Sequence, residues 1–372
     1  MKERVAIIAC ENYEADIVYH AITRIFDLLS LDDVVKGRER LILKPNLCLP
    51  VDYTRHLTTH PQIVKQTARV LMERCGAFDL TIADTCIGQD AERLLQVWEK
   101  SGMNRVSDEL GIKKNRLDKD VRMVSVEIAN RRFDLPISQF ALASDIINLP
   151  KLKTHGYMML SGCVKNLYGL LAGDAKKYFH GAAHDKITFA QLLQGLSSKM
   201  PCLFHITDAV IGIEGDGPGV KGIPKKIGAL VAGRNAIAID RVLARLICAP
   251  IGSVLTNLIA VEEEFEIELV GDPIELFITR DYKLPHIDSR RDTVTQHAIS
   301  AKMLQLSINV EMCIGCNECV KNCPTGALRK STLAPTLDGE RCIKCLVCFE
   351  TCCHGAIDSS RNALWNLLND KL

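Results

Sequence analysis

The sequence of 372 residues has few aromatic side chains and almost no net charge. Phe, Trp and Tyr make up 5% of the chain, and 46 Lys and Arg against 45 Asp and Glu leave a net charge of +1. Nucleic-acid binding relies on an excess of cations and on aromatic rings that stack on bases. We therefore expect no nucleic-acid partner.

Long apolar runs are also missing. No window approaches the roughly 18 consecutive apolar residues that suggest a membrane span, and the N-terminal apolar run, residues 5–10, is too short for the core of a signal peptide. We expect a cytoplasmic protein without a membrane span. Its 16 cysteines would then lie in a reducing compartment, where disulfides are rare.

Nucleotide-binding fingerprints are absent as well. The glycine-rich residues 214–219 are similar to a phosphate loop, but they lack the lysine followed by Ser or Thr and the Gly-x-Gly-x-x-Gly spacing. ATP- or NAD-dependent chemistry is therefore disfavoured.

Cysteine is abundant instead, and eight cysteines near the C-terminus form a two-fold repeat. Each half has three cysteines two residues apart and a fourth after three more residues. This is the bacterial pattern for two [4Fe–4S] clusters, in which the fourth cysteine of each half ligates the other cluster. One predicted cluster has the ligands Cys313, Cys316, Cys319 and Cys352, and the other has Cys342, Cys345, Cys348 and Cys323.

Two alternatives at this repeat remain. A structural zinc site normally takes its four ligands from two paired knuckles, so the evenly spaced triplets favour iron–sulfur clusters. Cys353 stands where the first half has Pro324; we interpret it as a bystander thiol, with ligand exchange with Cys352 as the alternative. Over about fifty residues the segment resembles the two-cluster ferredoxin family, and oxygen-sensitive clusters suggest an anaerobic setting.

The region before the repeat alternates apolar strands with amphipathic helices. Strands are predicted at residues 5–10, 41–46, 80–84, 145–150, 203–213, 227–232 and 274–279, and helices at 14–29, 59–75, 90–101, 158–171 and 235–248. Thr59 is the predicted N-cap of the second helix. The alternation implies an α/β domain with a mostly parallel sheet and helices on both faces. The charged residues 111–135, with two short strands, form a predicted peripheral excursion.

These patterns divide the chain into four parts. Residues 1–280 form the α/β domain, residues 281–304 a polar linker, residues 305–360 a small α+β ferredoxin-like domain with two [4Fe–4S] clusters, and residues 361–372 a C-terminal helix.

Polar residues follow several predicted strands, where open α/β sheets bind their ligands. They bring lysines, carboxylates and one imidazole, a cationic mixture that attracts a small anion such as a carboxylate or phosphate. The residues predicted to act in catalysis are Lys44, Asp84, Lys151, Lys153, His155 and Asp216, and those predicted to bind substrate are Asn46, His60, Lys165 and Asn166. Each also has an ordinary explanation as a surface or capping residue.

Within this set the three strand-end lysines Lys44, Lys151 and Lys153 would hold the anion. His155 is the candidate proton donor because the ordinary pKa of histidine lies near neutrality. Asp84 and Asp216 would orient His155 or bind a cation.

Two further groups of residues are candidates for metal sites. His180 and His184 have the spacing of helix-borne ligands, but no third ligand lies nearby in the sequence. Cys48, Cys86 and Cys163 each lie two residues from a polar residue, so they either bind a further metal or are buried thiols.

At these motifs the first 270 or so residues resemble the domain of unknown function 362 family. The resemblance rests on Lys44-Pro45-Asn46, Thr59-His60-Pro61, residues 149–155, Lys165-Asn166, residues 214–218 and the helix with Asp240. The fusion to a ferredoxin-like tail is similar to that family's frequent architecture. The resemblance implies an iron–sulfur protein with a shared crevice, and it transfers no reaction.

We therefore expect an iron–sulfur oxidoreductase whose clusters relay electrons to a small anionic substrate in the crevice, supplied by a redox partner such as a ferredoxin or a reductase. One alternative is a non-enzymatic electron carrier or iron–sulfur delivery protein, with the large domain as docking surface. Another is a cofactor-modifying or ligase-type enzyme with structural clusters.

Overall fold

The computed structural model describes residues 2–77, 79–85, 91–183, 185–260, 265–286 and 304–361. The predicted C-terminal helix, most of the predicted linker, Cys86 and His184 lie outside the described residues. Within the described ranges, no helix is both long enough and apolar enough to cross a membrane.

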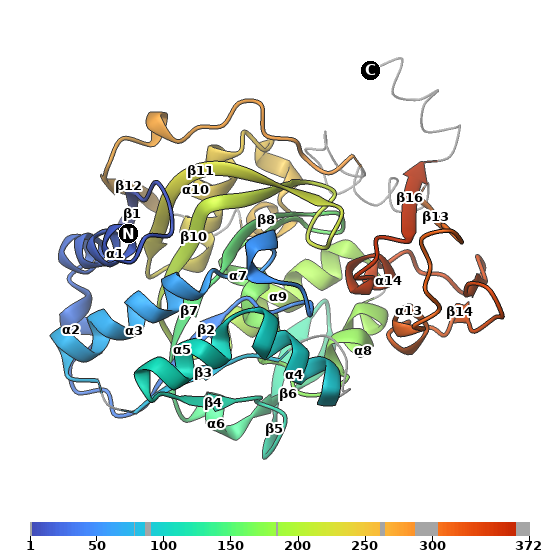
Figure 1. Cartoon of the computed structure of the whole chain (residues 1–372), viewed down its shortest axis with the longest axis horizontal. Coiled ribbons are helices and arrows are strands. Elements are labelled where there is room, and N and C mark those ends of the chain that lie inside the picture. Colours follow the sequence, from blue (N-terminus) through green and yellow to red (C-terminus); the bar gives the residue numbers. More distant parts are fainter. Residues whose placement is uncertain are drawn as a thin grey trace.

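A large mixed sheet forms the centre of the α/β part (Figure 1). Its strands are β1 (Lys2–Ala9), β2 (Leu41–Pro45), β3 (Leu80–Ala83), β4 (Lys113–Asn115), β7 (Asp145–Leu149), β8 (Lys151–His155), β9 (Met159–Ser161), β10 (Cys202–Gly215), β11 (Gly222–Gly233) and β12 (Glu266–Gly271). The order is β12-β1-β11-β10-β7-β2-β3-β4, with β8 beside β10 and β9 beside β8. Only the pairs of β11 and the pair β8–β9 are antiparallel. The predicted α/β class with a mostly parallel sheet is confirmed.

Helices cover both faces of this sheet. The first face carries α1 (Ala15–Leu29), α2 (Leu31–Val35), α3 (Pro61–Cys75), α4 (Ala91–Lys100) and α5 (Met103–Leu110), and the second carries α7 (Cys163–Asn166), α9 (Lys186–Lys199), α10 (Ala236–Leu246) and α11 (Leu255–Leu258). Successive residues of a strand point to opposite faces of the sheet. In β2, Leu41 and Leu43 pack in the core on the first face, and Ile42 packs in the core on the second. The strands are therefore apolar throughout, as parallel strands buried on both faces usually are.

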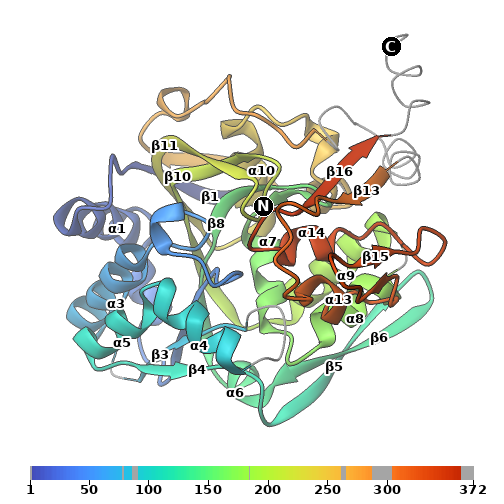
Figure 2. The ribbon, with the colours of Figure 1, turned by 45° about the vertical axis from the view of Figure 1, so that its right-hand side comes forward.

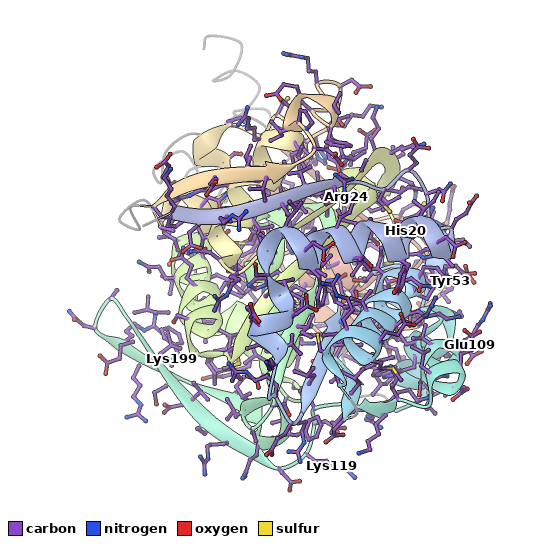
Figure 3. The ribbon with its side chains drawn as sticks, turned by 90° about the vertical axis from the view of Figure 1, so that its left-hand side faces the viewer. His20, Arg24, Tyr53, Glu109, Lys119 and Lys199 are labelled. Atoms are coloured by element: carbon purple, nitrogen blue, oxygen red, sulfur yellow. The ribbon has the colours of Figure 1, made fainter. Side chains whose placement is uncertain are left out.

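The outer surface of α1 is polar and ties the helix to the edge of the sheet (Figure 3). Arg24 pairs with Asp272, which follows β12, at 2.9 Å, and Asp272 also accepts a hydrogen bond from the Ala9 amide at 2.7 Å. These contacts fix β12 beside β1.

Shorter elements complete the α/β part. These are α6 (Gln139–Leu142), α8 (Ala175–Ala182), η1 (Tyr53–Arg55), η2 (Leu167–Leu170), η3 (Ile251–Ser253) and η4 (Ile274–Leu276). The hairpin of β5 (Val121–Ile128) and β6 (Arg131–Ser138) forms a separate two-stranded sheet, whose buried Val126 packs on α9 at Gly195.

Three local predictions were wrong. The N-cap of α3 is His60, whose Nδ1 accepts from the Gln62 amide at 3.2 Å, because the Thr59 hydroxyl is already bonded to the Asn46 amide and the Leu149 carbonyl. Residues 274–279 contain the short helix η4, and the edge strand is β12 before it. Residues 158–171 are not one helix, since the left-handed backbone at Met159 (φ 66°) starts β9.

The C-terminal part repeats one small motif twice. Antiparallel strands β13 (Leu304–Ile308) and β16 (Ile357–Arg361) pair its two ends, and β14 (Leu328–Arg329) pairs with β15 (Thr336–Leu337). Helix α13 (Glu318–Lys321) carries Cys319, and α14 (Val347–Thr351) carries Cys348. Each helix follows two left-handed residues, Gly315 and Asn317 in one half and Lys344 and Leu346 in the other. The sequence repeat is therefore a backbone repeat.

Candidate functional site

A cavity of ≈ 80 Å³ lies between the ends of the central strands and helix α14 of the C-terminal part. Five lysines line it: Lys44, Lys153, Lys165, Lys176 and Lys177. Two carboxylates, Asp84 and Glu350, and two imidazoles, His155 and His180, share the wall. The cavity is therefore cationic and has room for several waters or for one small molecule.

Lys44 and Asp84 form a buried ion pair at one side of this cavity. The Lys44 Nζ lies 2.8 Å from Asp84 Oδ1, and the two side chains are 0% and 3% exposed. Asp84 also accepts hydrogen bonds from the amides of Leu47 and Thr85, both at 2.8 Å. A buried pair keeps its charges only with such extra partners, so Lys44 and Asp84 largely neutralise each other.

Lys153 contacts neutral acceptors instead. Its Nζ donates to Asn46 Oδ1 at 2.7 Å and to the Leu57 carbonyl at 2.9 Å, and Cys48 Sγ lies at 3.4 Å. A chain of amides holds this arrangement, because Asn46 donates to Asn166 Oδ1 at 2.9 Å and Asn166 donates to Asn148 Oδ1 at 2.7 Å. The positive charge of Lys153 is thus held in place but not cancelled.

Lys165 is positioned by the short helix α7. The buried Asp240 of α10 accepts from the amides of Cys163 at 2.6 Å and Val164 at 3.1 Å, and so satisfies the start of α7. A Cβ on Gly162 would collide with the Asp240 carboxylate. The Lys165 ammonium lies 5.0 Å from the ring centre of Tyr168 and 5.9 Å from that of Phe189, both within cation–π range.

His155 and Glu350 meet where the two parts of the protein touch. His155 Nδ1 accepts from the amides of Tyr157 and Met158 at 3.2 and 3.3 Å, which leaves the proton on Nε2. Nε2 lies 3.3 Å from Glu350 Oε1 without the alignment of a hydrogen bond. Burial, and then the neighbouring Lys165, lowers the pKa of His155 well below its ordinary value. The imidazole is therefore neutral.

The C-terminal part lies against the α/β part of its own chain (Figure 2), and polar side-chain contacts hold it there. Arg93 of α4 pairs with Glu318 at 3.2 Å and donates to the Thr351 carbonyl at 3.2 Å. On the opposite side, His286 Nε2 lies 2.8 Å from the Ser359 carbonyl oxygen, and Lys221 pairs with Asp358. Helix α14 consequently forms one wall of the cavity.

The eight cysteines of the repeat fall into two spatial groups. Burial, and to a smaller extent the neighbouring thiols Cys316, Cys352 and Cys313, raise the pKa of Cys319 to about 11. Cys345 and Cys348 have Cys323 and Cys342 as neighbours, and Cys348 also has Cys319 of the first group nearby. Each fourth cysteine thus lies beside the triplet of the other half. Four thiols gathered in this way are the donor set of a [4Fe–4S] cluster.

Comparison with known sequences agrees with both parts of the molecule. Residues 41–245, more than half of the chain, match the family described as domain of unknown function (DUF362). The chain belongs to the DUF362 family. Residues 306–329 match the 4Fe-4S binding domain, so this DUF362 member is an iron–sulfur protein with a ferredoxin-type domain. The predicted fusion of these two units is confirmed.

A curated relative of this DUF362 protein is the "thylakoid-associated protein" of Synechocystis sp.. The two are 27% identical over 256 residues, which cover 66% of this chain and 75% of the relative.

Most of the predicted site residues of this DUF362 protein line the one cavity. They are Lys44, Asn46, Asp84, Lys153, His155, Lys165 and Asn166. Lys151, His60 and Asp216 do not line it. Lys151 pairs with Asp208 at 2.9 Å and with the Tyr13 hydroxyl at 2.8 Å, because in register it lies opposite Asp208 of β10.

The other two misplaced residues have structural partners. His60 stacks on Tyr13 with ring centres 3.7 Å apart and caps α3. Asp216 bonds to the ring of His286 at 2.6 Å. Both contacts come from distant segments that strand-end reasoning cannot see.

Sequence reasoning missed Glu350, Lys176, Lys177, Ser161 and Tyr168 in the cavity wall. One signal existed for Glu350, since the internal repeat places it opposite Lys321 of the first half. A change from cation to carboxylate between two otherwise similar halves indicates that the second half faces a different environment.

The described residues of the two further candidate metal sites do not share one site. Cys48 lines the cavity, whereas Cys163 is buried beside Thr207 at 3.4 Å. His180 lines the cavity, and His184 and Cys86 lie outside the described residues. In the ranges that the structure describes, no three His, Cys, Asp or Glu side chains converge on the scale of a single ion.

Proposed function

We propose that this DUF362 protein is an iron–sulfur oxidoreductase that binds two [4Fe–4S] clusters and acts on a small anionic molecule in the lysine-lined cavity. The observation that carries the proposal is helix α14. This five-residue helix holds the cysteine Cys348 and also presents Val347 and Glu350 to the cavity. Ligand cysteines and cavity wall are therefore adjacent parts of one element.

The cysteine groups support two clusters with crossed ligands. Cys313, Cys316, Cys319 and Cys352 would hold one cluster, and Cys342, Cys345, Cys348 and Cys323 the other. When bound, the clusters would supply one-electron transfer at a potential set by their surroundings. The amide of Ala356, which donates to Cys352 Sγ at 3.3 Å, is one such influence.

The charges of the cavity support an anionic substrate. Asp84 balances Lys44, and Asp174, at 2.8 Å, balances Lys177. Lys153 has only neutral acceptors, and Lys165 has no hydrogen-bond acceptor among the described residues. Lys153 thus keeps a positive charge that none of its own partners cancels, within a largely buried space. An anion would relieve this imbalance.

His155 has the placement of a hydrogen-bond donor, whereas its lowered pKa leaves no imidazolium to act as the predicted proton donor. Its Nδ1 is held by two backbone amides, so the proton on Nε2 points toward Glu350 and the cavity. The cavity wall also includes the apolar side chains of Val347 and Pro218. In this account, His155 donates to the bound molecule and Lys153 orients its negative group.

The test is reoxidation of the reduced protein by small molecules. The holoprotein is purified without oxygen and reduced with dithionite, the excess dithionite is removed, and an oxygen-free small-molecule extract of host cells is added while the visible absorbance is followed. We expect recovery of the oxidised spectrum, slowed about tenfold or more by Lys153→Ala, because a charge-assisted hydrogen bond contributes roughly 1.5–3 kcal/mol. The exposed Lys113→Ala is the matched control.

Two results would contradict the proposal. Recovery only with a partner protein, and never with the small-molecule fraction, would favour a pure electron carrier. Equal recovery in wild type, Lys153→Ala and His155→Ala would remove the cavity from the reaction.

A further inference from the structure

Lys165 differs from the other lysines of the cavity in its partners. Lys44 pairs with Asp84, Lys153 donates to Asn46 and Leu57, and Lys177 pairs with Asp174. The Lys176 ammonium donates to the Thr85 carbonyl. For Lys165, the described residues supply only the faces of two aromatic rings. Its amino group is thus the one that remains open to a ligand.

The surroundings of Lys165 favour an uncharged amine. Burial has the largest effect and lowers the pKa of Lys165; Glu350, the next largest influence, raises it, and the like charge of Lys153 lowers it again. A lysine that is desolvated and lies next to another cation is the usual form of a nucleophilic amine in enzymes. Anion binding alone would not require this environment, since a hydrogen-bonded lysine such as Lys153 already serves it.

The backbone around Lys165 is held rigidly. Asp240 binds the amides of Cys163 and Val164, and Asn166 donates to Asn148. Gly162 allows the close approach of Asp240. The amine is therefore presented at a defined position, as nucleophilic catalysis requires.

We propose that Lys165 forms an imine with the carbonyl carbon of a small 2-oxo acid, whose carboxylate group is held by Lys153. This inference rests on the proposed function, because it names the substrate class of the same cavity. Three properties select the class: the cavity is small, its uncompensated charge is positive, and its open group is an amine that attacks carbonyl carbon.

The step is balanced without a further reagent. The electron pair of Lys165 Nζ forms a bond to the carbonyl carbon, the carbon–oxygen double bond breaks, and the oxygen leaves as water with the two amine protons. The neutral His155 can donate its Nε2 hydrogen bond to the departing oxygen. Once the neutral imine nitrogen takes up a proton from water, its carbon is poorer in electrons than the carbonyl carbon, which prepares the bound molecule for reduction.

The experiment is reductive trapping in the complete protein. Anaerobic holoprotein is incubated with pyruvate and sodium cyanoborohydride, and adducts are located by intact mass and peptide mapping. We expect one adduct, on Lys165, that is absent in Lys165→Arg, unchanged in Lys113→Ala and suppressed by inorganic phosphate as a competing anion. Mapping in the wild type locates the adduct even if Lys165→Arg folds poorly.

Other outcomes overturn the inference. Adducts scattered over exposed lysines, or a single adduct on another cavity lysine, would show that Lys165 is not the nucleophile. Pyruvate binding measured by calorimetry, but without an adduct on Lys165, would contradict the imine and leave the proposed redox function intact. Failure of the proposed function shows separately, in the reoxidation experiment.

Discussion

A single glycine decides whether the buried Lys44–Asp84 ion pair can form. Gly169 passes directly over the pair, and a Cβ there would overlap Asp84 Oδ1 and come within 2.5 Å of Lys44 Nζ. We predict that Gly169→Ala lowers the free energy of unfolding by about 3 kcal/mol, because it separates two charges whose side chains are buried. Thermal unfolding of the anaerobic protein measures this loss.

The matched control for this prediction is Gly339→Ala. Its added methyl group would meet no atom within 4 Å, so the melting temperature should stay close to that of the wild type. If both variants unfolded at the same temperature, the close approach at Gly169 would have no energetic role.

His60 predicts a pH dependence of stability. Burial lowers the pKa of His60 to about 4 from 6.5, so between these values the folded state binds fewer protons than the unfolded state. The stability contributed by neutral His60 is then complete above pH 6.5 and is lost as the pH falls toward 4, by about 3 kcal/mol in total. Protonation would also remove the acceptor that caps α3.

The variant His60→Asn keeps an N-cap acceptor but does not titrate. We expect its free energy of unfolding, measured by urea denaturation, to fall less steeply than that of the wild type between pH 6.5 and pH 5. The difference between the two proteins is the quantity of interest, since cluster loss in acid affects both. Parallel curves would contradict the role given to His60.

Single residues also show how much of the candidate site could be predicted from the sequence. Lys44, Asn46 and Asp84 could be placed in one crevice because they end neighbouring parallel strands, whose carboxyl ends share an edge. Lys151 could not be excluded from that crevice. Its partner Asp208 lies within the long strand β10, and the register that pairs them is a tertiary property.

Helix α14 connects the cluster cysteines to the cavity, and Arg93 of α4 anchors it to the α/β part. The Arg93 side chain, 10% exposed, pairs with Glu318 and donates to the Thr351 carbonyl at the end of α14. We predict that Arg93→Ala increases amide hydrogen exchange in α14 by about tenfold or more, because it removes the donor to the Thr351 carbonyl and leaves Glu318 paired only with the exposed Lys321 among the described residues. Exchange in β2 and β7 should not change.

The exposed Arg105→Ala on the neighbouring helix α5 is the control, since Arg105 only pairs with Glu109 one turn away. Equal exchange in α14 for both variants would show that the domain contact does not depend on Arg93.

Elements marked by an apolar run or by a clear helical period were predictable, and elements that depend on remote partners were not. The apolar strands β2, β7 and β10 stand out in the sequence, as do α1 and α10. In contrast, β12 alternates charged and apolar residues at an edge, and its pairing with β1 becomes visible only in three dimensions. The break of residues 158–171 into β9, α7 and η2 depends on Asp240, which is remote in sequence.

At the scale of the whole molecule, the main finding is that the C-terminal part docks on its own chain. The sequence left open whether the ferredoxin-like segment contacts its own crevice or that of a neighbour. Contacts from Arg93, His286 and Lys221 fix it at the crevice of the same chain. Side-chain pairs of this kind join residues far apart in the sequence. They leave no local sequence pattern from which the contact could be predicted.

The chemistry proposed for the cavity needs two [4Fe–4S] clusters with crossed ligands. A count of metal per chain tests the presence of these clusters most directly. Iron and acid-labile sulfide are measured per chain in protein purified without oxygen, together with other metals. We expect about eight iron and eight sulfide ions per chain in the wild type, and about four of each in Cys345→Ser if one cluster is lost. About four iron in the wild type, or zinc in place of iron, would contradict it.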